Sequence, residues 1–319
     1  MSFALEVKKE LSTIQADECC KKAELYGIIR YKATLKLSQA GLGVEIITTH
    51  NVVARRIVYL FKKIYELSLE IKAIRREKLD YKTKYVLTLY GDTMKLLQEL
   101  KILNPDYSIN EQLNYDIIKK DCCKAAMIRG LFLVQGSINN PDTGNYHLEI
   151  TLENEYDIKY IQDILATVNI FPKYIVRKKG YVLYLKKSEQ IGDFLNFIGA
   201  VNNLFAFEDL RIKKDYSNYV NRIINCDMAN VQKALNSANS QLENIKCLTE
   251  HQGLVQLTQR LTDAIVLRTT YPEYSLADLS DVSEETVGRY ISKSGLSHCF
   301  KDIESLCREI KGEDKKNLD

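Results

Sequence analysis

The residues of this chain best suited to chemistry are its eight cysteines and four histidines. Four of the cysteines form the adjacent pairs Cys19-Cys20 and Cys122-Cys123, and no CxxC motif occurs. This usage is typical of a protein in a reducing compartment and not of a disulfide framework. Neighbouring residues on a helix point about 100° apart, so adjacent cysteines do not converge on one metal ion. We expect the cysteines to fill the apolar core instead. We therefore predict no metal site and no cofactor.

A second kind of chemistry, the binding of phosphate, is indicated by cations that recur in two similar segments. They are Lys72, Arg75, Arg76 and Lys78 in one segment and Lys173, Arg177, Lys178 and Lys179 in the other. Residues 1–225 hold 34 Lys and Arg against 27 Asp and Glu, whereas residues 254–319 hold 9 against 12. If the chain binds an acidic polymer, its first part is the main electrostatic surface. The alternative is a solvated sheet edge that lysines protect from further pairing.

These segments belong to an internal repeat in which matching positions lie 103 residues apart. The matches include Cys20 with Cys123, Ala23 with Ala126 and Gly27 with Gly130. A unit of about 90 residues indicates a pseudo-twofold duplication and not a solenoid, whose repeats are shorter. Small residues at the same spacing on two helices let their backbones approach closely. We therefore expect a packed helix pair on the pseudo-twofold axis.

Each repeat predicts the element order α-β-β-α-β-β-α, with its strands in one antiparallel sheet of four. In the second copy, Asp121 can cap a helix that runs to about Val134, and Gly136 is placed for a left-handed C-terminal cap. Two such sheets would form a saddle wide enough to lie along a duplex. The predicted domains are a first repeat over 1–120 and a second repeat over 121–216.

The C-terminal third predicts helices only. Residues 217–253 are mostly polar, and we interpret them as a connecting helix. In the predicted domain 254–319, a helix closed near Pro272, a short helix from Ser275 and a last helix from about Ser294 have the order of a helix-turn-helix. A generic small helical bundle is the alternative. The candidate DNA-contacting residues here are Ser275, Lys293, Ser294, Ser297, His298 and Lys301.

The duplicated unit resembles the LAGLIDADG homing endonuclease fold. In that fold a helix ends in the pattern L-A-G-L-I-D-A-D-G, and the copies here read L-Y-G-I-I-R-Y-K-A and I-R-G-L-F-L-V-Q-G. The resemblance implies that the eighth position of each copy is where the nucleases hold a metal-binding acid. Those positions are Lys32 and Gln135, where lysine repels the ion and glutamine offers only a neutral carbonyl. We interpret them as an abandoned metal site with no catalytic residue.

The order of all the parts resembles the WhiA family, bacterial transcription regulators named for their part in sporulation. The resemblance covers nearly the whole chain and is carried by SFALEVKKEL, IRGLFLVQGSINNP, NCDMAN, AIVLRTTYPEYSLADL and ISKSG. The chain departs from the family pattern in a few extra residues around Glu284 to Tyr290. It also has Cys299 after His298, where the family usually has arginine.

We accordingly predict an α+β fold, with two pseudo-symmetric LAGLIDADG-type repeats followed by an all-α helix-turn-helix domain. The expected function is that of a non-enzymatic regulator that binds double-stranded DNA, in the cytoplasm and at the nucleoid. The resemblance implies a role in cell division, chromosome segregation or sporulation. One alternative is a scaffold for another transcription factor or a division protein, with weak DNA binding. A more remote alternative is a metal-dependent endonuclease.

No membrane association is expected from the sequence. Met1 to Gln15 lacks the apolar run of a signal peptide. No stretch approaches the roughly 20 apolar residues of a membrane span. The oligomeric state is left open.

Overall fold

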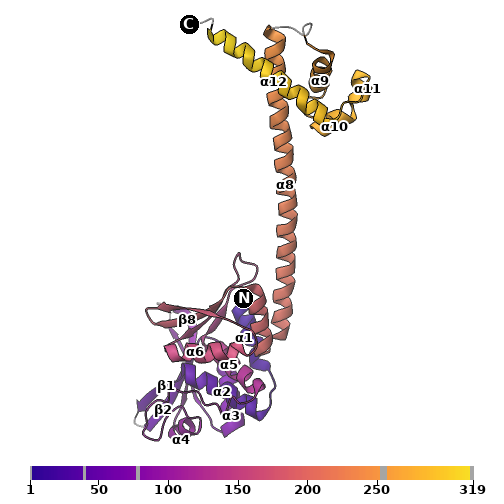
Figure 1. The fold of residues 1–319 in the computed structure, drawn as a ribbon. Coiled ribbons are helices and arrows are strands. Elements are labelled where there is room, and N and C mark those ends of the chain that lie inside the picture. The colour runs from indigo at the N-terminus through magenta and orange to yellow at the C-terminus, as the bar shows by residue number, and fades with distance from the viewer. Residues whose placement is uncertain (1, 39–40, 77–79, 252–256, 317–319) are drawn as a thin grey trace. The chain divides into compact units, whose positions relative to one another are not determined.

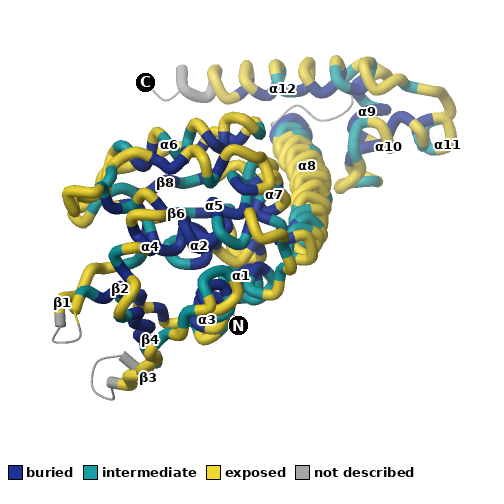
Figure 2. Tube along the Cα trace, turned by 90° about the horizontal axis from the view of Figure 1, so that it is seen from below, coloured by how far each residue is buried: buried dark blue, intermediate teal, exposed yellow. Residues whose placement is uncertain are grey.

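The computed structural model describes residues 2–38, 41–76, 80–251 and 257–316, and it divides into two compact units, Met1–Asp215 and Tyr216–Asp319. The first unit contains the duplicated part, and the second is helical (Figure 1). The helix α8 (Val201–His251) contributes residues to both units. Its middle, residues 221–233, is exposed throughout (Figure 2), and Ile223, Ile224, Met228 and Val231 are among the exposed side chains.

The two repeats have the same order of elements. After α1 (Phe3–Thr13), the first repeat contains α2 (Glu18–Lys32), β1 (Thr34–Ser38), β2 (Gly41–Thr48), α3 (Asn51–Tyr65), β3 (Glu70–Arg76), β4 (Asp80–Leu89) and α4 (Thr93–Glu99). The second contains α5 (Asp121–Gln135), β5 (Gly136–Ile138), β6 (Leu148–Leu152), α6 (Glu155–Ala166), β7 (Lys173–Arg177), β8 (Gly180–Leu185) and α7 (Ser188–Ile198). The sheets are antiparallel in the matching orders β1-β2-β4-β3 and β5-β6-β8-β7. The predicted α-β-β-α-β-β-α units and α+β fold are confirmed.

The helices α2 and α5 form the centre of the first unit (Figure 1), and they pack along the predicted small residues. A Cβ added to Gly27 would lie 2.4 Å from the carbonyl oxygen of Met127, and one added to Gly130 would lie 2.2 Å from that of Glu24. The two contacts are equivalent under the repeat, because positions 24 and 127 also differ by 103 residues. We call this contact between α2 and α5 the glycine seam.

Two local predictions about α5 were wrong. Asp121 is the first residue of the helix, and Lys120 is its N-cap. Gly136 has φ −85°, so it is no left-handed cap and begins β5 instead. A Cβ at this position would lie 2.2 Å from Cδ2 of Phe132. The glycine is therefore needed because a buried ring packs directly on the backbone.

A buried ion network crosses the glycine seam, and nothing in the sequence analysis indicated it. Glu24 is fully buried, and its carboxylate accepts hydrogen bonds from Nε and Nη2 of Arg56 at 2.7 and 2.8 Å. Nε of Arg129, from the second repeat, donates to the same carboxylate at 3.0 Å. Removing one partner from such a network leaves an uncompensated buried charge, which is strongly destabilising.

Each sheet packs one face against helices and leaves the other face outward. In β2 the side chains of Val44, Ile46 and Thr48 are buried, whereas Glu45 and Ile47 between them are not. This is the alternation expected of a strand that is covered on one side. We call the two outward faces together the saddle face.

The second unit packs four further helices against the end of α8. They are α9 (Gln259–Thr270), α10 (Leu276–Asp281), α11 (Ser283–Val287) and α12 (Lys293–Lys316). Its core includes Leu248, Leu267, Leu279, Phe300 and Ile303. The predicted helices of the helix-turn-helix are present, and α11 is formed by the extra residues noted in the sequence. The domain boundaries proposed from the sequence stay predictions.

The cysteines are less uniformly buried than expected. Cys20, Cys123, Cys247, Cys299 and Cys307 are buried, but Cys19, Cys122 and Cys226 are exposed. The prediction that all of them fill the core is thus wrong for these three. Within the described residues, every helix is too short or too polar to cross a lipid bilayer.

Candidate nucleic-acid interface

The first turns of α12 present the polar residues predicted to contact DNA. Lys293, Ser294, His298 and Lys301 are exposed, and Ser297 is half-buried. The opposite side of the helix is buried in the core through Leu296, Cys299, Phe300 and Ile303. Because residues three and four apart share a helix face, Ser294, Ser297, His298 and Lys301 form one outward stripe.

The start of α12 is fixed by a residue that the sequence analysis missed. The hydroxyl of Ser292 accepts a hydrogen bond from the backbone N–H of Gly295 at 3.2 Å, and its carbonyl accepts from that of Leu296. This is the geometry of an N-cap. A serine just before a helical run is the signal that could have identified it.

Ser275 has a structural role that competes with DNA contact. Its hydroxyl accepts from the N–H of Asp278 at 3.3 Å, and its own N–H donates to the Asp278 carboxylate at 3.0 Å. This capping box begins α10. Before it, the guanidinium of the buried Arg268 donates to the carbonyl oxygens of Tyr271, Pro272 and Tyr274, which fixes the turn between α9 and α10. Arg268 was not among the residues predicted from the sequence to have a role.

The cations of the first unit lie on the second hairpin of each repeat. Lys72 and Arg75 are exposed on β3, and the side chains of Arg76 and Lys78 lie outside the described residues. On β7 and the following turn, Lys173, Arg177, Lys178 and Lys179 are all exposed. The last three also line a shallow hollow with Val176 and Gly180. The structure therefore brings Arg177, Lys178 and Lys179 together at one hairpin tip, whereas Lys173 lies at the other end of β7.

Further along the strands, carboxylates offset the positive charge of the saddle face. Lys36 pairs with Glu45 at 2.7 Å, Lys72 with Glu70 at 2.9 Å, and Arg177 with Glu149 at 3.9 Å. Apolar side chains lie among these pairs, since Ile47, Ile74 and Ile175 are exposed on the same faces. Over the described residues the saddle face is thus mixed in charge, and three exposed cations, Arg177, Lys178 and Lys179, gather at the tip of β7–β8.

Lys32 and Gln135 meet at the C-terminal ends of α2 and α5, as their equivalent places in the repeat predict. They line a pocket of about 200 Å³ together with Arg30, Glu153 and Asp157. Nε2 of Gln135 donates to the carbonyl oxygen of Tyr31 at 3.0 Å. The glutamine therefore makes a hydrogen bond between the repeats.

The electrostatics of this pocket do not fit a divalent cation. Asp157 is in an ion pair with Arg30 at 3.0 Å, and burial raises the pKa of Asp157, although the pair opposes that effect. Burial and then the charge of Lys32 lower the pKa of Lys8 to about 8, and Nζ of Lys8 lies 5.9 Å from the centroid of the Phe132 ring. The other lining carboxylate is Glu153, and the same lining contains the cations Arg30 and Lys32. A hard cation needs several anionic oxygens.

Three family models match the chain in order. Residues 18–103 match the WhiA N-terminal LAGLIDADG-like domain, residues 124–217 the WhiA LAGLIDADG-like domain, and residues 220–307 the WhiA C-terminal HTH domain. The chain is 38% identical to the probable cell division protein WhiA of Oceanobacillus iheyensis, over 98% of each chain. The chain belongs to the WhiA family. The probable cell division protein WhiA of Bacillus licheniformis shows the same identity and coverage.

A solved WhiA structure shares the fold. The crystal structure of full-length DUF199/WhiA from Thermatoga maritima matches with a TM-score of 0.58 and 23% identity, covering 97% of this chain and 99% of that one. The family and the fold predicted from the sequence are confirmed.

This WhiA chain carries its two departures from the family pattern inside the helical unit. Cys299 is fully buried, with its Sγ 3.2 Å from Nε of Arg260, so it faces the core and not DNA. The extra residues form α11, which hydroxyl groups fasten in place: Ser280 donates to the carbonyl of Ile291 at 2.7 Å, and Ser283 accepts from the Ile291 N–H at 2.9 Å. Neither Cys299 nor the residues of α11 belong to the outward stripe of α12.

Proposed function

We propose that this WhiA chain is a sequence-specific regulator that binds double-stranded DNA through α12 and cuts no DNA. The observation that carries the proposal is the outward stripe of Ser294, Ser297, His298 and Lys301 on a helix whose other side is fixed in the core. A helix that is held in this way can enter the major groove and present short polar side chains to base edges. The curated relatives are named probable cell division proteins, and genes of division are the proposed targets, at the nucleoid in the cytoplasm.

The hairpin tips supply phosphate contacts in this proposal. Lys178 and Lys179 are exposed in the turn between β7 and β8, past the last strand pair of Arg177 and Gly180. Contacts to phosphates position a protein on a duplex but carry no sequence information. The acidic helical unit has few cations, so it depends on such contacts for affinity.

Selection of duplexes from a random library with the full-length protein tests the proposal. An enriched motif is expected, and Lys293→Ala/His298→Ala/Lys301→Ala should lose it, because each good base contact is worth about 1–3 kcal/mol. Lys246→Ala/Lys311→Ala, which removes two exposed lysines of the same unit, is the control and should keep the motif. No enrichment by the wild-type protein, or the same motif from the triple variant, contradicts the proposal.

A second function is favoured by the mixed character of the saddle face. Exposed isoleucines among charge pairs that neutralise one another are more typical of a protein interface than of a phosphate surface. The scaffold function would place another transcription factor or a division protein on this face. DNA binding through phosphate contacts depends steeply on salt, whereas binding of a protein partner to the saddle face does not. A salt titration therefore separates the two functions.

A further inference from the structure

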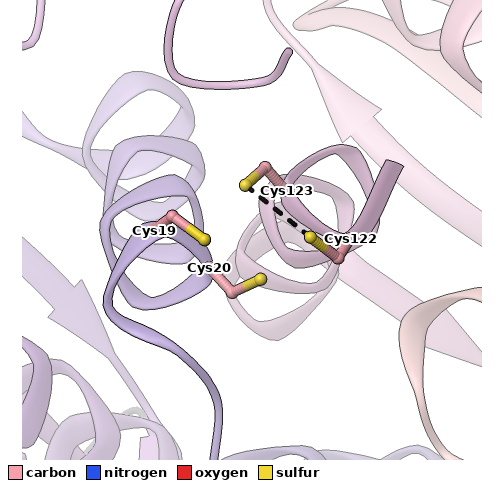
Figure 3. Close-up of side chains that lie close together, drawn as sticks. All are labelled: Cys19, Cys20, Cys122 and Cys123. Atoms are coloured by element: carbon pink, nitrogen blue, oxygen red, sulfur yellow. Dashed lines mark hydrogen bonds between the residues drawn. The ribbon is translucent and has the colours of Figure 1, made fainter. Parts of the chain in front are cut away.

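Four thiols converge at the N-terminal ends of α2 and α5. Cys19 and Cys20 come from the first turn of α2, and Cys122 and Cys123 from the first turn of α5. All four Sγ atoms lie within 4.8 Å of one another, and those of Cys122 and Cys123 are 4.0 Å apart. Figure 3 shows the four sulfur atoms directed toward the space between the two helices.

The glycine seam explains why the cysteines meet. Adjacent cysteines on one helix diverge, which was the reason to expect no metal site. The close approach at Gly27 and Gly130 sets the starts of the two helices side by side. The two cysteines of one helix therefore lie next to the two cysteines of the other. Cys20 and Cys123 are equivalent in the repeat and buried, whereas Cys19 and Cys122 are exposed, which leaves a way in from solvent.

The spacing of the sulfur atoms fits one tetrahedral ion. With Zn–S bonds of about 2.3 Å, the sulfurs of a four-thiolate site lie about 3.8 Å apart. The observed upper limit of 4.8 Å exceeds this by an amount that small side-chain rotations can close. In an iron–sulfur cluster the four thiolates are divided among two or four irons and are spread more widely. An all-sulfur tetrahedral set selects zinc over harder divalent ions.

The surroundings suit the charge of such a site. Four thiolates and one Zn²⁺ carry two net negative charges. The open pocket beside Cys19 and Cys123 is lined by four lysines and two carboxylates. Lys22 pairs with Glu99 and Lys101 with Asp116, so Lys119 and Lys120 supply the net positive charge. The positive ends of the α2 and α5 dipoles also point at the thiolates. The lysines and the helix starts thus stabilise the anionic complex.

We propose that Cys19, Cys20, Cys122 and Cys123 together bind one zinc ion, which joins the two repeats at the start of their central helices. Each thiol gives up its proton to solvent when its sulfur becomes a ligand, so no oxidant or reductant takes part. The site lies at the opposite ends of α2 and α5 from Lys32 and Gln135, and it does not depend on the function proposed above.

The test uses the full-length protein, purified under reducing conditions, loaded with Zn²⁺ and freed of excess metal. Elemental analysis should find about one zinc per chain. Loading with Co²⁺ instead should give the visible bands of tetrahedral cobalt together with thiolate-to-metal charge transfer. The Cys19→Ser/Cys122→Ser variant changes only exposed residues and should bind metal at least about tenfold more weakly. Cys226→Ser, which removes another exposed cysteine, is the control and should match the wild type.

A second measurement guards against a variant that merely misfolds. Removal of zinc by a chelator should lower the Tm of the wild type and of Cys226→Ser, and leave that of the double variant unchanged, with circular dichroism reporting the fold of each. The proposal is overturned if the wild type binds no stoichiometric metal, or if the double variant binds as the wild type does. Inorganic sulfide bound with iron, or a mass that shows disulfides in the freshly reduced protein, also overturns it.

Discussion

The carbonyl oxygen of Glu24 lies where position 130 would have to place a side chain, only 2.2 Å from an ideal Cβ on Gly130. Gly130→Ala must therefore push α2 and α5 apart or bend one of them. We expect a loss of about 1–3 kcal/mol in the free energy of unfolding, even though alanine is intrinsically the better helix residue by up to about 1 kcal/mol. Denaturant titration measures it.

Gly144→Ala is the matched control, because a Cβ there meets nothing within 4 Å. Its stability should stay near that of the wild type. Equal stabilities of Gly130→Ala and Gly144→Ala would show that α2 and α5 have room for a methyl group at the glycine seam.

Lys8 gives the protein a pH dependence above neutrality. Its pKa is lowered to about 8 by burial and by Lys32, whereas in the unfolded chain it is near 10.4. Between these values the unfolded state holds the proton and the folded state does not, so stability should rise with pH. Lys8→Met should abolish this rise and stabilise the protein at pH 7 by up to about 3 kcal/mol.

The measurement is the difference in unfolding free energy between wild type and variant at pH 7 and near pH 10, which cancels the titration of other groups. Lys62→Met, at an exposed position of α3, should leave the wild-type slope intact. A Lys8→Met protein less stable than the wild type at pH 7 would mean that the ammonium group has a favourable role.

The residues at the C-terminal ends of α2 and α5 predict that the protein does not cut DNA. With Lys32 and Gln135 in place of acids, and with Asp157 bound to Arg30, Mg²⁺ or Mn²⁺ finds too few anionic oxygens between the helices. Supercoiled and linear DNA should stay intact at protein excess with either ion. Reproducible nicking that EDTA stops, and that Glu153→Gln reduces, would show instead that the protein is a metal-dependent nuclease.

The cations of β7–β8 should set the salt dependence of DNA binding. Lys173→Ala/Arg177→Ala/Lys178→Ala/Lys179→Ala removes four exposed cations. The log–log slope of affinity against salt should flatten by about 0.9 for each phosphate that the variant no longer neutralises. A control with Lys62, Lys63, Lys95 and Lys159 changed to alanine loses the same charge at exposed positions elsewhere in the unit. If both variants change the slope equally, only net charge matters, and the scaffold function gains support.

How much the sequence could predict depended on whether an interaction was local or crossed the repeat. The order of elements along each repeat and the glycine seam were predictable, because the same sequence pattern occurs twice and each copy supports the assignment of the other. The network of Glu24, Arg56 and Arg129 was not, since Glu24 and Arg129 have no charged equivalents in the repeat. Cap assignments such as Gly136 failed because ring packing by Phe132, and not backbone conformation, selects the glycine there.

The cysteine cluster was within reach of the sequence and was still missed. Cys20 and Cys123 match in the repeat, and the predicted helix pair implies that matched residues at the helix starts lie close together. An adjacent pair on one helix diverges, and only the pairing of the two helices brings the four thiols together. The residues of α12 that are proposed to contact DNA differ from this case, because only the fold of the second unit decides which side of the helix is covered.

The glycine seam also bears on how the protein is made. The helix α2 leaves the ribosome about one hundred residues before α5, so during that interval its buried face has no partner. The nascent first repeat should therefore remain open and prone to aggregate until Gln135 has emerged, and the unit should then close in one cooperative step that joins distant parts of the chain. A chain stalled before α5 is expected to be a chaperone substrate, and one stalled after α7 is not.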